Sequence, residues 1–117
     1  MSVSATTAVL REAKAVLERN GWFQGEYVDR RPEFDGVALR ECPVCLLGAL
    51  NVAAGREADD IGMRDDLRPL DVLQTLIRRR GFRRPVHAWN DVKDRTVDDV
   101  LALLDEAIEL VEAGDAR

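Results

Sequence analysis

Two cysteines and a single histidine are the residues of this sequence best suited to covalent or metal chemistry. Cys42 and Cys45 are separated by Pro43-Val44 and precede an apolar stretch that predicts a helix. A thiol in the first turn of a helix faces unpaired backbone N–H groups and the positive end of the helix dipole, and both favour the thiolate. With Cys42 as the N-cap residue, Cys45 would occupy the third helical position. The pattern therefore indicates a candidate nucleophilic thiol at Cys45.

A cysteine-dependent hydrolase or transferase needs a base and an orienting group beside its thiol. His87 is the one histidine of the chain, and Asn90 follows it three residues later. Cys45, His87 and Asn90 are thus the candidate catalytic residues. His87 and Asn90 share one short loop, however, and no strand pattern indicates a sheet that would hold them opposite the helix. We therefore treat an enzyme as the alternative and not as the leading hypothesis.

The Cys42–Cys45 pair is also compatible with a redox dithiol or with half of a zinc site. A redox pair of the thioredoxin type follows a strand in a βαβ unit, and no such strand is indicated before Cys42. Structural zinc needs four ligands, of which this pair supplies two. We favour two reduced, partly buried thiols, with no metal and no cofactor.

Aromatic and amide side chains suggest a second candidate site. Trp89-Asn90-Asp91 lies between Pro85 and the last predicted helix. Asn and Asp side chains stabilise turns by bonding nearby backbone groups, so a structural loop is expected here. The alternative is a ligand-binding loop, in which Trp89 and Asp91 would line a pocket together with Trp22 and Tyr27.

Five arginines fall within seven residues, at Arg78, Arg79, Arg80, Arg83 and Arg84. The remaining chain carries 12 basic against 22 acidic residues, so positive charge is segregated into this segment. Segregation predicts a partner, either an acidic protein surface or nucleic acid phosphate. A helix–turn–helix is disfavoured because the helices before and after the 55–68 segment are too far apart. The competing interpretation is favourable placement of arginines at a helix C-terminus.

The elements that must position these residues are mainly α-helical. The chain has 117 residues, 46% of them hydrophobic, which fits a single domain over 1–117. Apolar periodicity predicts four helices, at about 6–20, 43–54, 69–80 and 96–113. Residues 22–41 have no helical period, and Asp35-Gly36 is a hairpin turn signal, so a short irregular or β-hairpin insertion is expected.

The 43–54 helix is apolar on every side, which predicts a central helix surrounded by protein. Gly48 is unfavourable inside a helix, so another element should cross close to it. The predicted architecture is a compact four-helix domain with this buried helix at its centre.

Several short motifs give the chain a resemblance to a known family. They are Gly21-Trp22 after the first predicted helix, Cys45 through Leu50, Trp89-Asn90-Asp91, Arg95-Thr96, and Val100-Leu101 through Ala107. In this order the chain resembles a small domain of unknown function found in actinobacteria and their phages. The resemblance implies a compact cytosolic domain, and it transfers no catalytic residue.

From these observations we expect a non-enzymatic protein-interaction or regulatory module. Its partner would be an unidentified protein, or a second copy of the chain in a homodimer, and nucleic-acid binding through Arg78–Arg84 is less favoured. A cytoplasmic location is expected, because no apolar run is long enough to span a bilayer and no signal-peptide pattern opens the chain.

Overall fold

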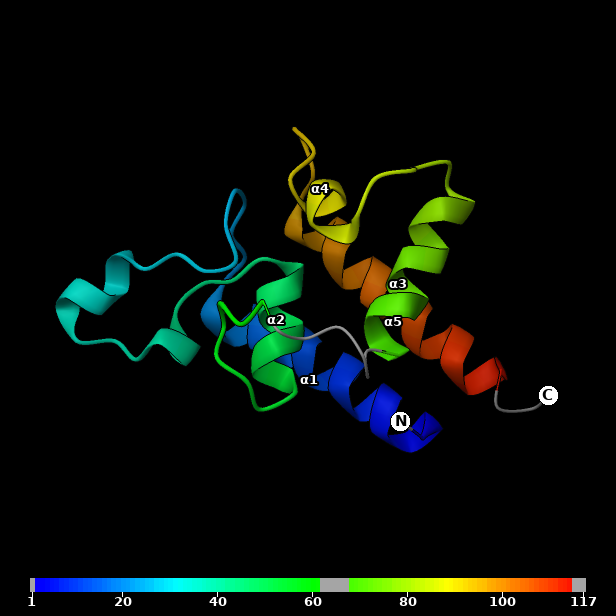
Figure 1. Cartoon of the computed structure of the whole chain (residues 1–117), viewed down its shortest axis with the longest axis horizontal. Coiled ribbons are helices and arrows are strands. Elements are labelled where there is room, and N and C mark those ends of the chain that lie inside the picture. The colour runs from blue at the N-terminus through cyan, green and yellow to red at the C-terminus, as the bar shows by residue number, and fades with distance from the viewer. Residues whose placement is uncertain (1, 62–67, 115–117) are drawn as a thin grey trace.

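The computed structural model describes residues 2–61 and 68–114, and these are mainly helical. They form five α-helices: α1 (Val3–Asn20), α2 (Leu46–Ala53), α3 (Arg68–Arg79), α4 (Val86–Asn90) and α5 (Val97–Gly114) (Figure 1). Two short 3-10 helices, Arg31–Asp35 and Leu39–Glu41, lie between α1 and α2. The mainly α class is confirmed, whereas the four-helix count is wrong for the described residues. No helix in these two ranges is long and apolar enough to cross a membrane.

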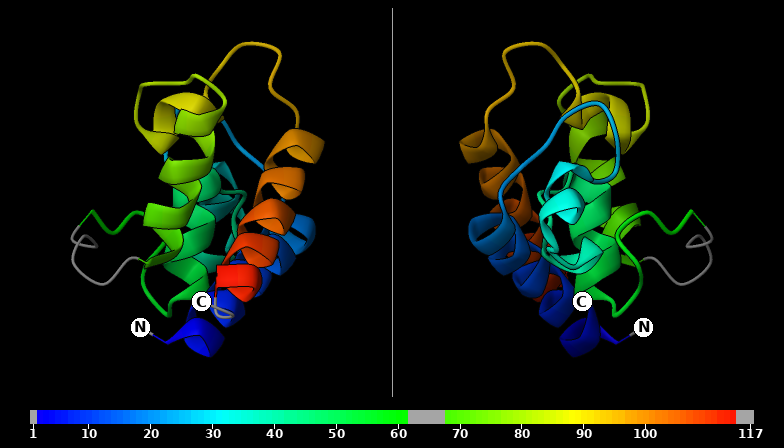
Figure 2. Two further views of the ribbon diagram at one scale, coloured as in Figure 1. Left: turned by 90° about the vertical axis from the view of Figure 1, so that its right-hand side faces the viewer. Right: turned by 90° about the vertical axis from the view of Figure 1, so that its left-hand side faces the viewer.

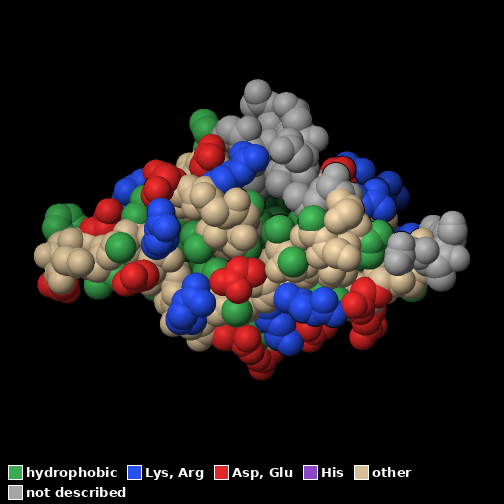
Figure 3. All heavy atoms as spheres, turned by 90° about the horizontal axis from the view of Figure 1, so that it is seen from below, with side chains coloured by type: hydrophobic (Ala, Val, Ile, Leu, Met, Phe, Trp, Pro, Cys, Tyr) green, Lys and Arg blue, Asp and Glu red, His purple; other side chains and the backbone are tan. Residues whose placement is uncertain are grey.

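Helix α1 packs against α2, α3 and α5, and its contacts with α2 and α5 are the most extensive between helices in the described residues. Its apolar stripe, Leu10, Ala13, Val16 and Leu17, is buried. Helix α5 runs antiparallel to α1 (Figure 2), and the ion pairs Arg11–Glu112 and Lys14–Asp105 connect the two along their exposed edges. Basic and acidic side chains are accordingly interspersed on the face shown in Figure 3.

Thr96 and Asp99 fix the start of α5. Thr96 N–H donates to Asp99 Oδ2 (3.0 Å), and Asp99 N–H donates to Thr96 Oγ1 (3.2 Å). These two reciprocal bonds are a capping box with aspartate in place of glutamate. They satisfy backbone donors that the helix itself leaves free, and so fix where α5 begins.

The 22–41 insertion is not a β-hairpin. Asp35 ends a 3-10 helix, and Gly36 takes the left-handed conformation (φ 85°) with its N–H bonded to the Glu33 and Pro32 carbonyls. The Asp-Gly pair thus makes a turn between two 3-10 helices instead of between two strands. Neither 3-10 helix contributes a buried residue, and the segment projects from the helices at the left of Figure 1. Phe34 on this projection is 91% exposed.

Residues 42–45 are extended, so the prediction of a helix beginning at Pro43 is wrong. Val44 forms a parallel bridge with Trp22 and an antiparallel bridge with Val28. Its N–H donates to Gly21 O (3.1 Å), and its carbonyl accepts from Phe23 N–H (2.9 Å). Because its backbone groups are used by neighbouring segments, the chain enters a helix only after Cys45, which is the N-cap residue of α2.

Helix α2 is buried over six consecutive residues, Leu46–Asn51, in agreement with its apolar sequence. Its main helical neighbours are α1 and α4, while α3 and α5 pack chiefly on α1 and on each other. In the described residues the other long helices are therefore not arranged around this helix, as the expected four-helix domain with α2 at its centre required. The 21–29 segment crosses α2 at Gly48, where the Tyr27 carbonyl lies against the glycine.

Helix α4 lies where the sequence predicts a loop. It has only five residues and no side-chain cap, which leaves too few positions for a helical period to be recognised. Val86, Ala88, Trp89 and Asn90 are nevertheless buried, and α4 packs against both α2 and α3. Its burial places Asn90 inside the protein.

A substitution at Gly48 tests directly whether the 21–29 segment lies against α2 at this residue. A Cβ at this position would overlap the Tyr27 carbonyl oxygen and lie 2.9 Å from Val44 Cβ. Alanine normally stabilises a helix interior by about 1 kcal/mol relative to glycine. Here Gly48→Ala should lower the free energy of unfolding by about 2 kcal/mol, because a backbone segment must move aside.

Urea denaturation of the Gly48→Ala protein measures this change. Gly114→Ala is the matched control, since a Cβ at Gly114 meets nothing within 4 Å, and it should leave the free energy of unfolding unchanged or slightly higher. A Gly48→Ala protein as stable as the wild type would show that Tyr27 does not hold the close approach described here.

Candidate functional site

The side chain of Asn90 is fully buried and joins three parts of the chain. Its Oδ1 accepts from Trp22 Nε1–H (2.7 Å) and from the Leu46 backbone N–H (3.0 Å). Its Nδ2 donates to the Phe23 carbonyl (3.2 Å) and to Asp91 Oδ1 (2.9 Å). An amide side chain has two donors and two acceptor lone pairs, so all four are used. We refer to these contacts as the Asn90 network.

The network continues through the residues on either side. Gly25 N–H donates to Asp91 Oδ1 (3.0 Å), and Gln24 Nε2 donates to the carbonyls of Asn90 and Val92, each at 3.0 Å. The 22–25 segment is therefore tied to the end of α4 by both backbone and side chain. The sequence placed Trp22, Asn90 and Asp91 among candidate site residues, but nothing in it indicated Gln24 or Gly25.

Trp89 is buried and points to a different part of the structure from Trp22. The Arg95 guanidinium lies 3.9 Å above the centroid of the Trp89 ring, and Arg95 Nε donates to the Trp89 carbonyl (2.9 Å). These contacts close the turn that leads from α4 into α5. Trp89 thus holds the connection between two helices, which accords with a structural loop.

Cys45 lies at the start of α2, directly beside the Asn90 network. Cys45 is only 3% exposed, and its Sγ accepts a hydrogen bond from the Gly48 N–H (3.4 Å). Burial raises the pKa of the thiol to about 11, although the N–H groups of Gly48 and Leu47 act in the opposite direction and the Asp91 carboxylate adds to the rise. Desolvation raises the pKa of the thiol by more than the N–H groups at the start of the helix lower it, so the thiol is protonated at neutral pH.

The three candidate catalytic residues are placed differently by the structure. Cys45 is the N-cap residue of α2. Asn90 is the last residue of α4, and its side chain reaches the start of α2, where Oδ1 accepts from the Leu46 N–H. His87 is exposed on α4. The donors and acceptors of Asn90 are already engaged by four other groups, and an orienting group for histidine would need one of them. A catalytic role for Cys45, His87 and Asn90 remains a prediction.

Cys42 is also a buried free thiol. Its Sγ–H donates to the Ala38 carbonyl (3.5 Å), and burial raises its pKa, with further contributions from Glu33 and Asp29. Across residues 2–61 and 68–114, no three histidine, cysteine, aspartate or glutamate side chains come together in a group that could hold a metal ion.

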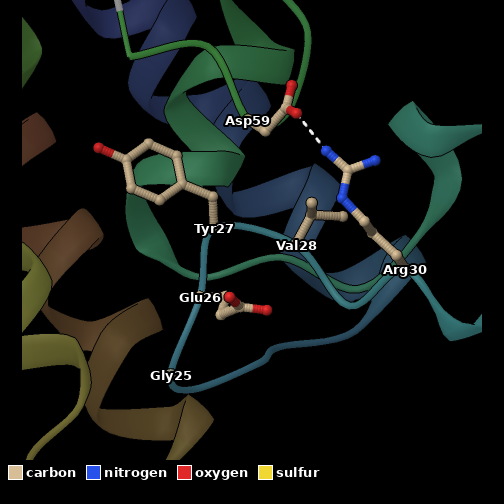
Figure 4. Close-up of a pocket in the computed structure, with 6 residues that line it drawn as sticks. All are labelled: Gly25, Glu26, Tyr27, Val28, Arg30 and Asp59. Atoms are coloured by element: carbon tan, nitrogen blue, oxygen red, sulfur yellow. Dashed lines mark hydrogen bonds and ion pairs between the residues drawn. The ribbon is translucent and has the colours of Figure 1, made fainter.

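A shallow groove of about 340 Å³ opens next to the Asn90 network, and we call it the Tyr27 groove. It is lined by Gly25, Glu26, Tyr27, Val28, Arg30 and Asp59 (Figure 4). Arg30 is ion-paired with Asp59, and these two side chains close one end, while the Tyr27 hydroxyl points away from them. Burial raises the Tyr27 pKa, and the Cys45 thiol raises it further. The groove therefore offers hydrogen-bonding groups beside a tyrosine whose hydroxyl holds its proton more firmly than usual.

The arginines at the end of α3 are arranged around a Schellman close. Phe82 N–H donates to the Ile77 carbonyl (3.0 Å) and Gly81 N–H to that of Arg78 (2.9 Å). Arg80 is ion-paired with Glu106 of α5. Arg78, Arg79, Arg83 and Arg84 are exposed, and in the described ranges none of them has a carboxylate within ion-pair distance. We call these four residues the unpaired arginine cluster.

Comparison with known proteins assigns the chain to a family. A family model described as "Family of unknown function (DUF6197)" matches residues 1–110. The chain belongs to the DUF6197 family. No curated protein and no solved structure matches it.

The DUF6197 match spans both the Asn90 network and the unpaired arginine cluster. It supports the expectation of an uncharacterised domain. The actinobacterial or phage origin and the motif pattern behind the resemblance are not addressed by this match and remain predictions from the sequence. Family membership attaches no activity to any residue, so a function has to be inferred from the geometry.

The raised pKa of Cys45 has a consequence for stability. The thiol of the unfolded chain loses its proton near pH 9, whereas the folded protein keeps it up to about pH 11. The resulting stabilisation is fully present below pH 9 and falls as the pH rises to about 11, by which point about 2–3 kcal/mol has been lost.

Cys45→Ser should remove this loss, since serine does not titrate and also caps helices well. Urea denaturation at pH 8, 9, 10 and 11 under reducing conditions should show a steeper decline for the wild type than for Cys45→Ser. Parallel pH profiles for the two proteins would mean that the thiol is not held in its protonated form by burial.

Proposed function

We propose that this domain binds another protein through the unpaired arginine cluster. The observation that carries the proposal is the contrast between these four side chains, which are close in sequence, and the seven basic residues that form ion pairs. Ion pairs within the described residues engage Arg11, Lys14, Arg19, Arg30, Arg31, Arg40 and Arg80. The unpaired arginine cluster is thus a concentration of uncompensated positive charge on a chain of net charge −5.

Placement at the end of a helix explains only part of this concentration. The negative end of the α3 dipole stabilises nearby cations by about 0.3–1 kcal/mol, and the effect falls off within the last turn. Arg78 and Arg79 lie in that turn, but Arg83 and Arg84 come after the helix has ended. Four neighbouring guanidinium groups repel one another, and an acidic partner surface would relieve that repulsion.

A protein partner is favoured over nucleic acid by the charges around the cluster. Glu106 and Glu109 of α5 line a hollow with Arg79, and the remainder of the chain is strongly acidic. Proteins that bind phosphate backbones present a continuous basic face, because each phosphate contact adds to the affinity. A small basic cluster beside carboxylates matches a localised acidic patch better.

A cysteine-dependent enzyme is the less favoured alternative, because the Cys45 thiol is buried and holds its proton. The two buried free thiols accord with action in a reducing compartment, for which we propose the cytoplasm. A homodimer held by the same surface is one form of the proposal, and the oligomeric state of the purified protein distinguishes it from a heteromeric complex.

Charge reversal tests the proposal. The variant Arg78→Glu/Arg79→Glu/Arg83→Glu/Arg84→Glu should lose the proteins that the wild type captures from a nuclease-treated lysate of its host, with at least a tenfold drop in recovery. The matched control is Arg11→Glu/Arg19→Glu/Arg40→Glu/Lys93→Glu, which changes the net charge equally and should retain capture. Circular dichroism checks that both variants remain helical.

Capture that survives reversal of the unpaired arginine cluster contradicts the proposal. If capture is seen only from a parallel lysate without nuclease, and duplex DNA binds in a salt-sensitive way, the cluster is assigned to nucleic acid instead.

A further inference from the structure

The segment that carries both buried cysteines, residues 42–45, is bonded through its backbone to two other parts of the chain. Val44 contributes two of these bonds, both to the 21–23 segment as described above. The 27–29 segment makes the other two, from Asp29 N–H to the Pro43 carbonyl (2.8 Å) and from Cys45 N–H to the Tyr27 carbonyl (3.0 Å). The 42–45 segment therefore cannot bend without breaking hydrogen bonds to both of its neighbours.

The extended backbone keeps the two cysteines too far apart for a disulfide. Cys42 (φ −79°, ψ 157°) and Cys45 (φ −78°, ψ 179°) both have extended angles. An extended chain rises about 3.1–3.3 Å per residue, so the two Cα atoms are separated by about 9–10 Å. A disulfide joins Cα atoms that are about 4.4–6.8 Å apart, and beyond about 7 Å the backbone has to move. A bond between these two sulfurs thus requires a turn where the folded chain is straight.

The two thiols also face different parts of the structure. Cys42 Sγ–H donates to the Ala38 carbonyl, which belongs to the insertion, whereas Cys45 Sγ accepts from Gly48 N–H in the first turn of α2. Side chains three residues apart in an extended chain point to opposite faces, which agrees with these two contacts. Cys42 and Cys45 are both buried. The fold therefore separates the two thiols and covers each of them.

We infer that this fold is redox-sensitive: it forms only while Cys42 and Cys45 are both thiols, and a disulfide between them opens it. The inference does not depend on the proposed function. It applies to the Cys42–Cys45 pair the opposite role from a redox dithiol, which alternates between its two states within one fold.

The oxidant is a low-molecular-weight disulfide, for which glutathione disulfide is the probe. One cysteine thiolate attacks a sulfur of the oxidant and releases one glutathione thiol. The second cysteine thiolate then displaces the other glutathione, and the protein disulfide forms. Two protein thiols are oxidised, one small disulfide is reduced, and the two protons pass to the two released thiols. Because buried thiols are inert, this exchange takes place in molecules that have opened.

The coupling between folding and the disulfide has a predictable size. A turn within residues 42–45 breaks the four backbone hydrogen bonds of the segment, and each of them changes an equilibrium constant by about two- to tenfold. Together they make the disulfide about a hundredfold or more less favourable in the folded protein than in the unfolded chain. Since linkage is reciprocal, the disulfide lowers the folding equilibrium constant by the same factor.

The first test measures thiol–disulfide exchange in the folded and the unfolded chain. The full chain is equilibrated with reduced and oxidised glutathione at a series of ratios, in buffer and in concentrated urea. The reaction is quenched with acid, and mass spectrometry quantifies the Cys42–Cys45 disulfide. In buffer, half-oxidation should require about a hundredfold more oxidising glutathione mixture than in urea. Oxidation at the same ratio in both conditions overturns the inference, as does a failure of the unfolded chain to form the intrachain disulfide.

The second test measures the stability of the oxidised protein. The chain is oxidised in urea, freed of glutathione and diluted from the urea, beside a reduced sample treated in the same way. Circular dichroism and urea denaturation should show a helical, cooperatively unfolding reduced protein, and an oxidised protein that is unfolded or unfolds at clearly lower urea concentration. Dithiothreitol should restore the reduced curve. An oxidised protein as stable as the reduced one overturns the inference.

The matched control is Cys42→Ser/Cys45→Ser, which keeps side chains of similar shape and cannot form the disulfide. Its denaturation curve should be the same with and without exposure to glutathione disulfide. A similar loss of stability in this variant would mean that the oxidant acts elsewhere, and would contradict the inference. If the variant does not fold, the recovery of the oxidised wild type on addition of dithiothreitol serves as the control, and a failure to recover contradicts the inference.

Discussion

The hydrogen bonds of the buried Asn90 amide are the constraint on which this fold depends. One side chain satisfies the indole N–H of Trp22, the first N–H of α2 and the Phe23 carbonyl, and it holds the Asp91 carboxylate in place. Without Asn90, the Trp22 N–H, the Leu46 N–H and the Phe23 carbonyl would be partly or fully buried without this partner, at a cost of about 1–3 kcal/mol apiece. The amide therefore fixes where α2 begins, how the chain leaves α1, and where α4 lies relative to both.

The residues that most resemble an active site in the sequence are thus occupied in building the protein. Cys45 caps α2, and Asn90 and Asp91 fasten the 22–25 segment. A group that must stay buried and bonded to hold the fold is poorly placed to act on a substrate. The residues that remain available lie elsewhere, on the exposed side of α3 and after its end. That separation, with the Asn90 network in one place and the unpaired arginine cluster in another, is the basis of the proposed binding function.

Sequence periodicity located the long helices because their apolar stripes repeat over many turns. The sequence also indicated the close approach at Gly48, because glycine is unfavourable inside a helix. It misplaced the start of α2, because Pro43 is acceptable in a first helical turn and nothing local reveals that Val44 pairs with Trp22 and Val28. The predictions of a hairpin and of a loop at α4 were wrong because the local signals are ambiguous. The Asp35-Gly36 pair is compatible with several types of turn, and the five residues of α4 are too few to show a helical period. Of the candidate site, Trp22, Asn90 and Asp91 were identified by type, but the bond between Trp22 and Asn90 joins residues 68 positions apart and could not be read from the sequence.

The central claim is that Trp22 and Asn90 act as one unit, and a double-mutant cycle tests it most directly. Trp22→Phe keeps the aromatic ring and removes the N–H, and Asn90→Ala removes the acceptor. If the 2.7 Å hydrogen bond joins the two, the losses in free energy of unfolding should fall short of additivity by about 1 kcal/mol or more. Additive losses would mean that the two side chains stabilise the protein independently, which contradicts the network described here.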